Sequence, residues 1–204
     1  MKKPRLAEVA IKNLWTENPI LIQILGICST LAVTNNLTNT SIMALGVIFT
    51  TSFSNFTVSL LKKLIPHQVR MIIQTLIIAF FVIIINITLK AFLPQISRAL
   101  GPYVGLIITN CIIMGRAEAF ARSNPVGLSL WDGFTSGAGY MAVLLIVAFF
   151  RELLGFGTLY GFRIMPEGFV TWTIMVTAPS AFFLLGVVIW VMKSVKDRKR
   201  KERT

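Results

Sequence analysis

The sequence predicts an all-α membrane protein with six transmembrane segments, arranged as two inverted repeats of three. Three observations support this fold class. Hydrophobic residues make up 55% of the 204 residues and the mean hydropathy is +0.75, as is typical of polytopic membrane proteins. Uncharged runs of membrane-spanning length recur along the chain. A proline followed nine residues later by a cysteine occurs once in each half.

Four uncharged runs match or approach the ~20 apolar residues that a helix needs to cross ~30 Å of hydrocarbon. These runs are residues 41–61, 71–89, 133–150 and 168–192. A longer uncharged stretch, residues 19–61, exceeds the length of one span. The polar residues 35–40 divide this stretch, so we expect a helical hairpin there.

Two further segments are too short to span the membrane comfortably. Residues 20–34, the first arm of the hairpin, would reach only ~22 Å at ~1.5 Å per residue. Residues 102–115 are of similar length and are cut off by the charged residues Arg116 and Glu118. We therefore expect segments 1 and 4 to be half-length helices.

The spacing of Pro19 and Cys28 recurs in Pro102 and Cys111 after a shift of 83 residues. Proline suits the first turn of a helix, so each half-helix is predicted to begin at its proline and to carry its cysteine near the middle. Three segments per repeat is an odd number, so the second repeat would cross the membrane in the opposite sense. The functional site is expected between the repeats, where helix amino ends favour an anion.

One membrane domain, residues 19–192, is predicted between a basic amino end, residues 1–18, and a basic tail, residues 193–204. Its repeat halves cover about residues 19–93 and 102–192. No cleavable signal peptide is expected, because no small-residue cleavage pattern follows the first apolar segment. The chain is therefore expected to be inserted intact.

The basic residues predict the orientation of this domain. Sixteen of the twenty Lys and Arg residues lie in the two ends and in the loops after segments 2 and 4. By the positive-inside rule both termini are then cytoplasmic. The net charge of +12 is explained by this asymmetry, so membrane lipid rather than nucleic acid is the expected partner of the basic tail.

Cys28 and Cys111 are the two cysteines of the chain, and their matched positions favour a shared metal. Zinc prefers four ligands in one site, and the single histidine, His67, is expected to be a solvated loop residue. Iron with bridging sulfide needs four thiolates, so a second chain would supply two of them. Hydrogen bonds from Thr109 and Asn110 to sulfur are possible. A disulfide or simple packing of the thiols is the alternative interpretation.

Four stretches carry a resemblance to a known family: LGICSTLAVT (25–34), GLIITNCIIMGRAEAF (105–120), FFRELLGFG (149–157) and APSAFFLLG (178–186). Together they resemble the D-type membrane subunits of sodium-translocating NADH:quinone oxidoreductases, over about residues 18–190. The TNC core is shared across the wider family, and the following GRAEAF resembles the D-type branch rather than its E-type sister.

The resemblance implies a six-helix subunit of a complex in the bacterial inner membrane. In that family the D and E subunits have opposite orientations and share an iron–sulfur centre, expected to be 2Fe–2S, to which each gives two cysteines. Here these would be Cys28 and Cys111. The implied function is to relay electrons while the complex couples NADH oxidation and quinone reduction to Na⁺ export. The closest alternative is the equivalent subunit of an Rnf-type ferredoxin:NAD oxidoreductase, and one of another class is an inverted-repeat transporter whose cysteines only pack.

Two glycine motifs do not predict further cofactors. Gly155-Phe-Gly157 has Tyr160 where a dinucleotide fingerprint needs its third glycine, and no strand is predicted before it, so no NAD site is expected. Residues 136–139 resemble a flavin-attachment sequence of sister subunits, but glycine replaces the hydroxyl, so no flavin is expected on this chain. Close helix packing is the expected role of Gly133, Gly137 and Gly139.

Glu118, Asp132 and Glu152 are the acidic residues nearest the membrane segments. Ion pairs with Arg116 and Arg151 at the interface are one interpretation of Glu118 and Glu152, and a cation path is the other. Asp132 has no obvious basic partner nearby in the sequence.

Overall fold

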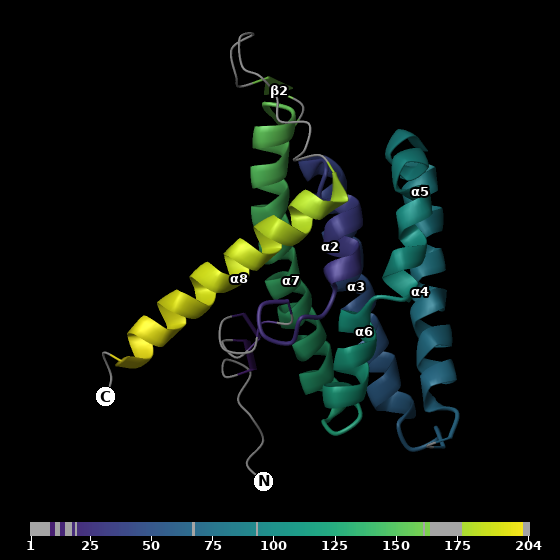
Figure 1. The fold of residues 1–204 in the computed structure, drawn as a ribbon. Coiled ribbons are helices and arrows are strands. Elements are labelled where there is room, and N and C mark those ends of the chain that lie inside the picture. Colours follow the sequence, from purple (N-terminus) through teal and green to yellow (C-terminus); the bar gives the residue numbers. More distant parts are fainter. Residues whose placement is uncertain are drawn as a thin grey trace.

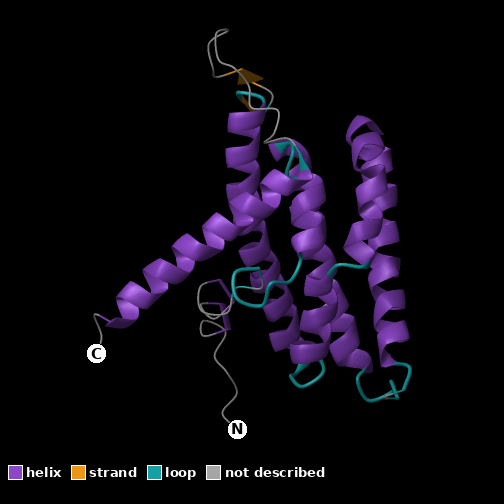
Figure 2. Cartoon of the chain, viewed as in Figure 1, coloured by secondary structure: helices purple, strands orange, loops and turns teal. Residues whose placement is uncertain are grey.

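Helices form nearly all the regular structure of the computed structural model (Figures 1 and 2). The structure describes residues 9–10, 13–14, 18, 20–66, 68–92, 94–160, 162–163 and 177–201. The helices are α2 (Ile27–Val33), α3 (Leu37–Leu61), α4 (Arg70–Phe92), α5 (Pro94–Ile108), α6 (Cys111–Arg116), the π-helical turn η2 (Ala117–Ala121), α7 (Val126–Gly155) and α8 (Ala178–Lys201). Two short antiparallel strands, β1 (Thr158–Leu159) and β2 (Phe162–Arg163), follow α7.

Four stretches of the described residues are long and apolar enough to cross a membrane. They are α3, α4, residues 103–121 and α7, and α8 adds a shorter apolar helix over residues 179–195. The prediction of a helical, multi-pass membrane protein is confirmed. Residues 168–176, which begin the predicted sixth segment, lie outside the described residues.

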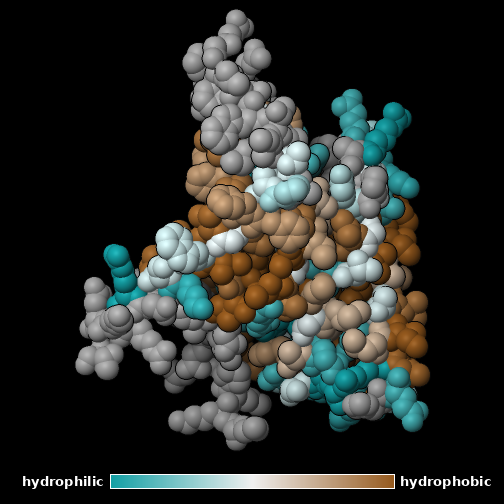
Figure 3. Space-filling model, in the orientation of Figure 1, coloured by the Kyte–Doolittle hydropathy of each residue, from teal (hydrophilic) through white to brown (hydrophobic). Residues whose placement is uncertain are grey.

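The arrangement of the helices suits a lipid environment. In Figure 1, α3 and α7 lie side by side in the centre, α4 and α5 form a pair on the right, and α8 runs obliquely on the left. Large apolar side chains of α4 are exposed, among them Ile72, Leu76, Phe80 and Ile87. Figure 3 shows hydrophobic residues over much of the middle of the visible face and hydrophilic ones gathered toward its upper and lower ends.

Two helices begin earlier than their hydropathy predicts. α3 starts at Leu37 rather than residue 41, because the Asn36 side chain accepts a hydrogen bond from the Thr38 backbone N–H (3.0 Å) and caps the helix. The hairpin turn is therefore confined to residues 34–36. α7 starts at Val126 rather than residue 133 and carries Asp132 into the bundle, where it is fully buried.

The two predicted half-length segments differ from expectation. Residues 20–26 are not helical, and only α2 forms within the first segment. Pro102 lies inside α5 rather than at the start of a helix, so that prediction is wrong, and Pro19 lies outside the described residues. Segment 4 is a broken span of full length. The chain is helical to Ile108, interrupted at residues 109–110, and helical again to Ala121.

Close contact between α3 and α7 forms the core of the described bundle. A Cβ on Gly133 would lie 2.8 Å from the Ser52 Cα, and one on Gly137 would lie 2.9 Å from the Ile48 Cα. A Cβ on Gly139 would meet the Asn13 carbonyl at 3.1 Å. The prediction that these glycines serve close packing is confirmed, because any side chain would force the backbones apart.

Candidate functional site

Cys28 and Cys111 occupy equivalent positions at the starts of two short helices. Cys28 is the second residue of α2 and Cys111 is the first residue of α6. Both thiols are free and exposed at the surface of the chain. The cysteines thus mark helix amino ends, rather than the middles of helices as the sequence suggested.

The chain enters the two helices by different local structures. Before α2, Ile24 and Gly26 both adopt positive φ angles (55° and 82°), and the Ser29 and Thr30 hydroxyls each donate to the Gly26 carbonyl (2.9 Å). Before α6, Asn110 is extended and its side-chain oxygen accepts from the Ile112 backbone N–H (3.1 Å). A left-handed turn precedes one cysteine and an asparagine cap precedes the other.

Residues next to the two cysteines are bonded to each other. The Asn110 side-chain amide donates to the Ser29 hydroxyl at 3.4 Å, and the Ser29 hydroxyl lies 2.5 Å from the Tyr140 hydroxyl. A Cβ on Gly26 would lie 2.9 Å from the Ile112 Cδ1. The segments carrying Cys28 and Cys111 therefore lie side by side, although 83 residues separate them in the sequence.

The carboxyl end of α7 holds the turn between α2 and α3. The Arg151 guanidinium donates to the Thr34 hydroxyl (2.6 Å) and to the Leu31 carbonyl (3.5 Å). The Glu152 carboxylate accepts from the Leu37 backbone N–H at 2.6 Å, at the first turn of α3. Both side chains are buried, so they anchor the first cysteine-bearing half-helix instead of forming an interfacial pair at the lipid surface.

The amino end of α7 holds α6 by an ion pair. The buried Asp132 carboxylate accepts from the Arg116 Nε (3.0 Å) and pairs with a second guanidinium nitrogen of the same side chain. The Asn13 amide also donates to Asp132 (2.8 Å). Asp132 has no basic partner nearby in the sequence, and the fold supplies one from 16 residues away. Because Arg116 is neutralised there, the helix continues through it, which explains why segment 4 is longer than predicted.

Glu118 confirms the expectation of ion pairing but not its partner. Its carboxylate pairs with Arg70 (2.6 Å) and Arg122 (3.1 Å) rather than with Arg116. His67 lies outside the described residues.

Sequence reasoning missed three residues of the site, namely Ser29, Tyr140 and Gly26. A serine and a glycine flanking Cys28 within two residues were visible in the sequence. Tyr140 gave no comparable signal, because its role depends on where α7 passes the half-helices.

The described residues contain no group of three or more His, Cys, Asp or Glu side chains placed to hold a metal ion. What the chain offers is two exposed thiols in adjoining segments. Two thiols are half of the four-thiolate set that an iron–sulfur centre needs.

A chain with several apolar helices of membrane-spanning length is a multi-pass membrane protein. Residues 6–189 match the family described as "Rnf-Nqr subunit, membrane protein". The chain belongs to this family.

Its relatives include proteins named as the D subunits of Na(+)-translocating NADH-quinone reductases. The protein of that name from Chlamydia pneumoniae is 50% identical over 93% of each chain. That from Pseudomonas paraeruginosa is 46% identical over 95% of this chain and 89% of its own. The resemblance to the D-type branch is thereby confirmed along nearly the whole chain, which is a non-autonomous subunit of an oxidoreductase complex.

Proposed function

We propose that this chain relays electrons inside a Na⁺-translocating NADH:quinone oxidoreductase, and that Cys28 and Cys111 supply two of the four ligands of an iron–sulfur centre. The observation that carries the proposal is the pairing of the two cysteine segments through Asn110 and Ser29, with both thiols exposed where a neighbouring chain can reach them. A bound iron–sulfur centre, expected to be 2Fe–2S, supplies one-electron chemistry between donors and acceptors on other subunits.

The residues of this chain position the two thiols. The left-handed turn at Gly26 and the cap at Asn110 end the preceding segments and begin the two helices at the cysteines. Helix amino ends stabilise the negative charge that thiolate ligands carry. Tyr140 and Ser29 join both segments to α7, so the thiols are set in place before a partner binds.

The partner that fits this half-site is a homologous six-segment subunit of E type, inserted with the opposite orientation. Two interrupted segments, one in each half of the chain, support an inverted repeat, because half-helices at matching positions mark the site in such folds. The basic residues support a cytoplasmic location for both termini in the bacterial inner membrane. Single cysteines introduced at Asn39, and not at Lys63, should then react with an impermeant label from outside.

The test is serine substitution of each cysteine in the assembled complex. Cys28→Ser and Cys111→Ser should leave assembly intact, because hydroxyl side chains are tolerated between membrane helices. Iron and sulfide bound by the complex should fall, and NADH-driven quinone reduction should be lost. NADH oxidation by an artificial acceptor should persist, since the nicotinamide chemistry is expected on another subunit.

Thr88→Ser provides a control, because Thr88 is an exposed hydroxyl residue of α4 and lies outside the two cysteine-bearing segments. It should keep full iron content and full quinone reduction. An assembled Cys28→Ser complex with normal iron and normal quinone reduction would refute the electron-relay role and favour a packing role or a transporter. Activity with ferredoxin instead of quinone would identify the Rnf-type complex.

A further inference from the structure

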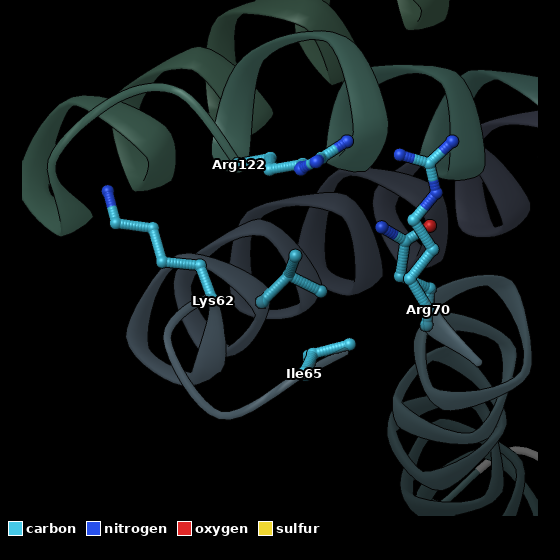
Figure 4. Close-up of a pocket in the computed structure, with 6 residues that line it drawn as sticks. Lys62, Ile65, Arg70 and Arg122 are labelled. Carbon is cyan, nitrogen blue, oxygen red and sulfur yellow. The ribbon is translucent and has the colours of Figure 1, made fainter. Parts of the chain in front are cut away.

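A cavity of about 250 Å³ opens at the end of the bundle where α3 ends and α4 begins (Figure 4). It is lined by Val58, Lys62, Ile65, Arg70, Gln74 and Arg122. The cavity lies apart from the cysteine site, because its walls come from the carboxyl end of α3, the first turns of α4 and the residue after η2. No part of the proposed electron relay uses it.

The cavity has an excess of positive charge. Lys62, Arg70 and Arg122 line it, whereas Glu118 is the acid that pairs with the two arginines. Each arginine pairs with Glu118 through one nitrogen, and a guanidinium has five N–H groups in all. Three cations against one carboxylate leave a net charge of about +2 at the site, which favours an anion with several acceptor oxygens.

The cavity also contains a buried hydrogen-bond acceptor that has no donor among the described residues. Gln74 is 2% exposed, and its amide nitrogen donates to the Glu118 carboxylate at 3.3 Å. The Gln74 side-chain oxygen is buried without a hydrogen-bond partner among the described residues. An unpaired buried acceptor is costly, so a ligand that brings a hydroxyl beside its anionic group would complete the site.

Two of the residues that line the cavity, Val58 and Ile65, are apolar. Val58 is buried in a small cluster with Ala117 and Ala121, and Ile77 packs against this cluster. The cavity therefore combines apolar and cationic lining residues at the depth where two membrane spans end, which is where lipid headgroups lie.

We propose that this cavity binds the phosphate of an anionic membrane lipid whose headgroup carries hydroxyls, as in phosphatidylglycerol. Arg70 and Arg122 contact the phosphate, and a headgroup hydroxyl donates to the Gln74 oxygen. Lys62, whose ammonium donates to the Asn124 carbonyl (2.7 Å), adds positive charge beside them. The volume is below the ~300–1,000 Å³ of pockets for drug-sized ligands, which suits a headgroup better than a whole cofactor.

Binding of spin-labelled lipids to the intact complex in detergent tests the charge part of the proposal. Phosphatidylglycerol should bind more tightly than phosphatidylcholine, and Lys62→Gln or Arg122→Gln should each weaken it about fivefold. Lys63→Gln is the matched control, because Lys63 is exposed beside Lys62 but does not line the cavity. Equal weakening by Lys63→Gln would overturn the site in favour of diffuse surface charge.

Phosphatidylmethanol tests the hydroxyl part, since it has the same charge and no headgroup hydroxyl. The native complex should prefer phosphatidylglycerol over phosphatidylmethanol, and Gln74→Met should abolish this preference while phosphatidylmethanol still binds. Competition by inorganic phosphate at concentrations matching the lipid would overturn the lipid assignment and identify a free-anion site. If every variant kept both preferences, for phosphatidylglycerol over phosphatidylcholine and over phosphatidylmethanol, the cavity would be ruled out as a ligand site.

Discussion

The two ends of α7 hold the two cysteine-bearing half-helices by different kinds of interaction. At its amino end, Asp132 forms a buried ion pair with Arg116 of α6. At its carboxyl end, Arg151 and Glu152 bind a hydroxyl, a carbonyl and a backbone N–H of the α2–α3 turn. The contact at the amino end depends on two charges that neutralise each other. At the carboxyl end, charged side chains form hydrogen bonds with neutral groups.

The difference predicts unequal sensitivity to mutation. Removing one member of a buried ion pair leaves an uncompensated charge, whereas removing a carboxylate that accepts from neutral donors leaves only unpaired donors. Substitutions at the amino end of α7 should therefore cost more stability than substitutions at its carboxyl end.

The largest effect is expected for Asp132→Asn. The Arg116 guanidinium would stay buried without a counter-charge, and the free energy of unfolding should fall by about 3–5 kcal/mol. Thermal melting of the purified complex, with subunit retention on size exclusion, measures this change. The double variant Arg116→Met with Asp132→Leu should recover part of the loss, because no buried charge remains but Asn13 loses two hydrogen-bond partners. If the double variant were as unstable as Asp132→Asn, the ion pair would contribute stability beyond the mutual neutralisation of its two charges.

Gly26→Ala should have the next largest effect, because Gly26 lies where the two half-helices meet. The backbone there has a φ of 82°, which disfavours any side chain, and an added methyl group would approach the Ile112 side chain at 2.9 Å and the Tyr140 ring at 3.0 Å. Together these should cost about 2–4 kcal/mol and reduce bound iron. Gly105→Ala in α5 is the control, since nothing lies within 4 Å of its added methyl. Unchanged stability of Gly26→Ala would contradict the close contact of the two segments.

Glu152→Ala should cost less than Asp132→Asn, at about 1–3 kcal/mol. It removes the acceptor of the Leu37 N–H and of the Thr158 hydroxyl, but Glu152 has no ion-pair partner among the described residues. Glu152→Gln keeps an acceptor and should retain most of the stability. The comparison of the α7 ends breaks down if Glu152→Ala proves more destabilising than Asp132→Asn in the same melting experiment.

The smallest effect is expected for Tyr140→Phe, which removes the hydroxyl 2.5 Å from Ser29 and keeps the ring. Stability should fall by about 0.5–1.5 kcal/mol. Because Ser29 also receives a bond from Asn110, a change in the spectroscopic signature of the proposed iron–sulfur centre would show that Tyr140 positions the thiols. An unaltered spectrum together with unaltered stability would reduce Tyr140 to a packing residue.

Hydropathy and residue spacing were enough to predict the class of protein and the candidate ligands. Long uncharged runs must lie in lipid, so α3, α4 and α7 could be located from hydropathy alone. Equal spacing of proline and cysteine in the two halves identified Cys28 and Cys111 as a pair, and the structure brings their neighbours Ser29 and Asn110 together. Small residues at Gly133 and Gly137 predicted the close packing of α7, because lack of a side chain is a local property.

The points where the helices begin and end depend instead on contacts between distant parts of the chain. Hydropathy assumes that a charge stops a membrane segment, so it ended one segment before Arg116 and began another after Asp132. The two side chains instead neutralise each other inside the bundle, across 16 residues of sequence, and both helices continue through them. Such pairing depends on which helix faces run side by side, and that is fixed by packing in three dimensions rather than by the order of residues in the chain.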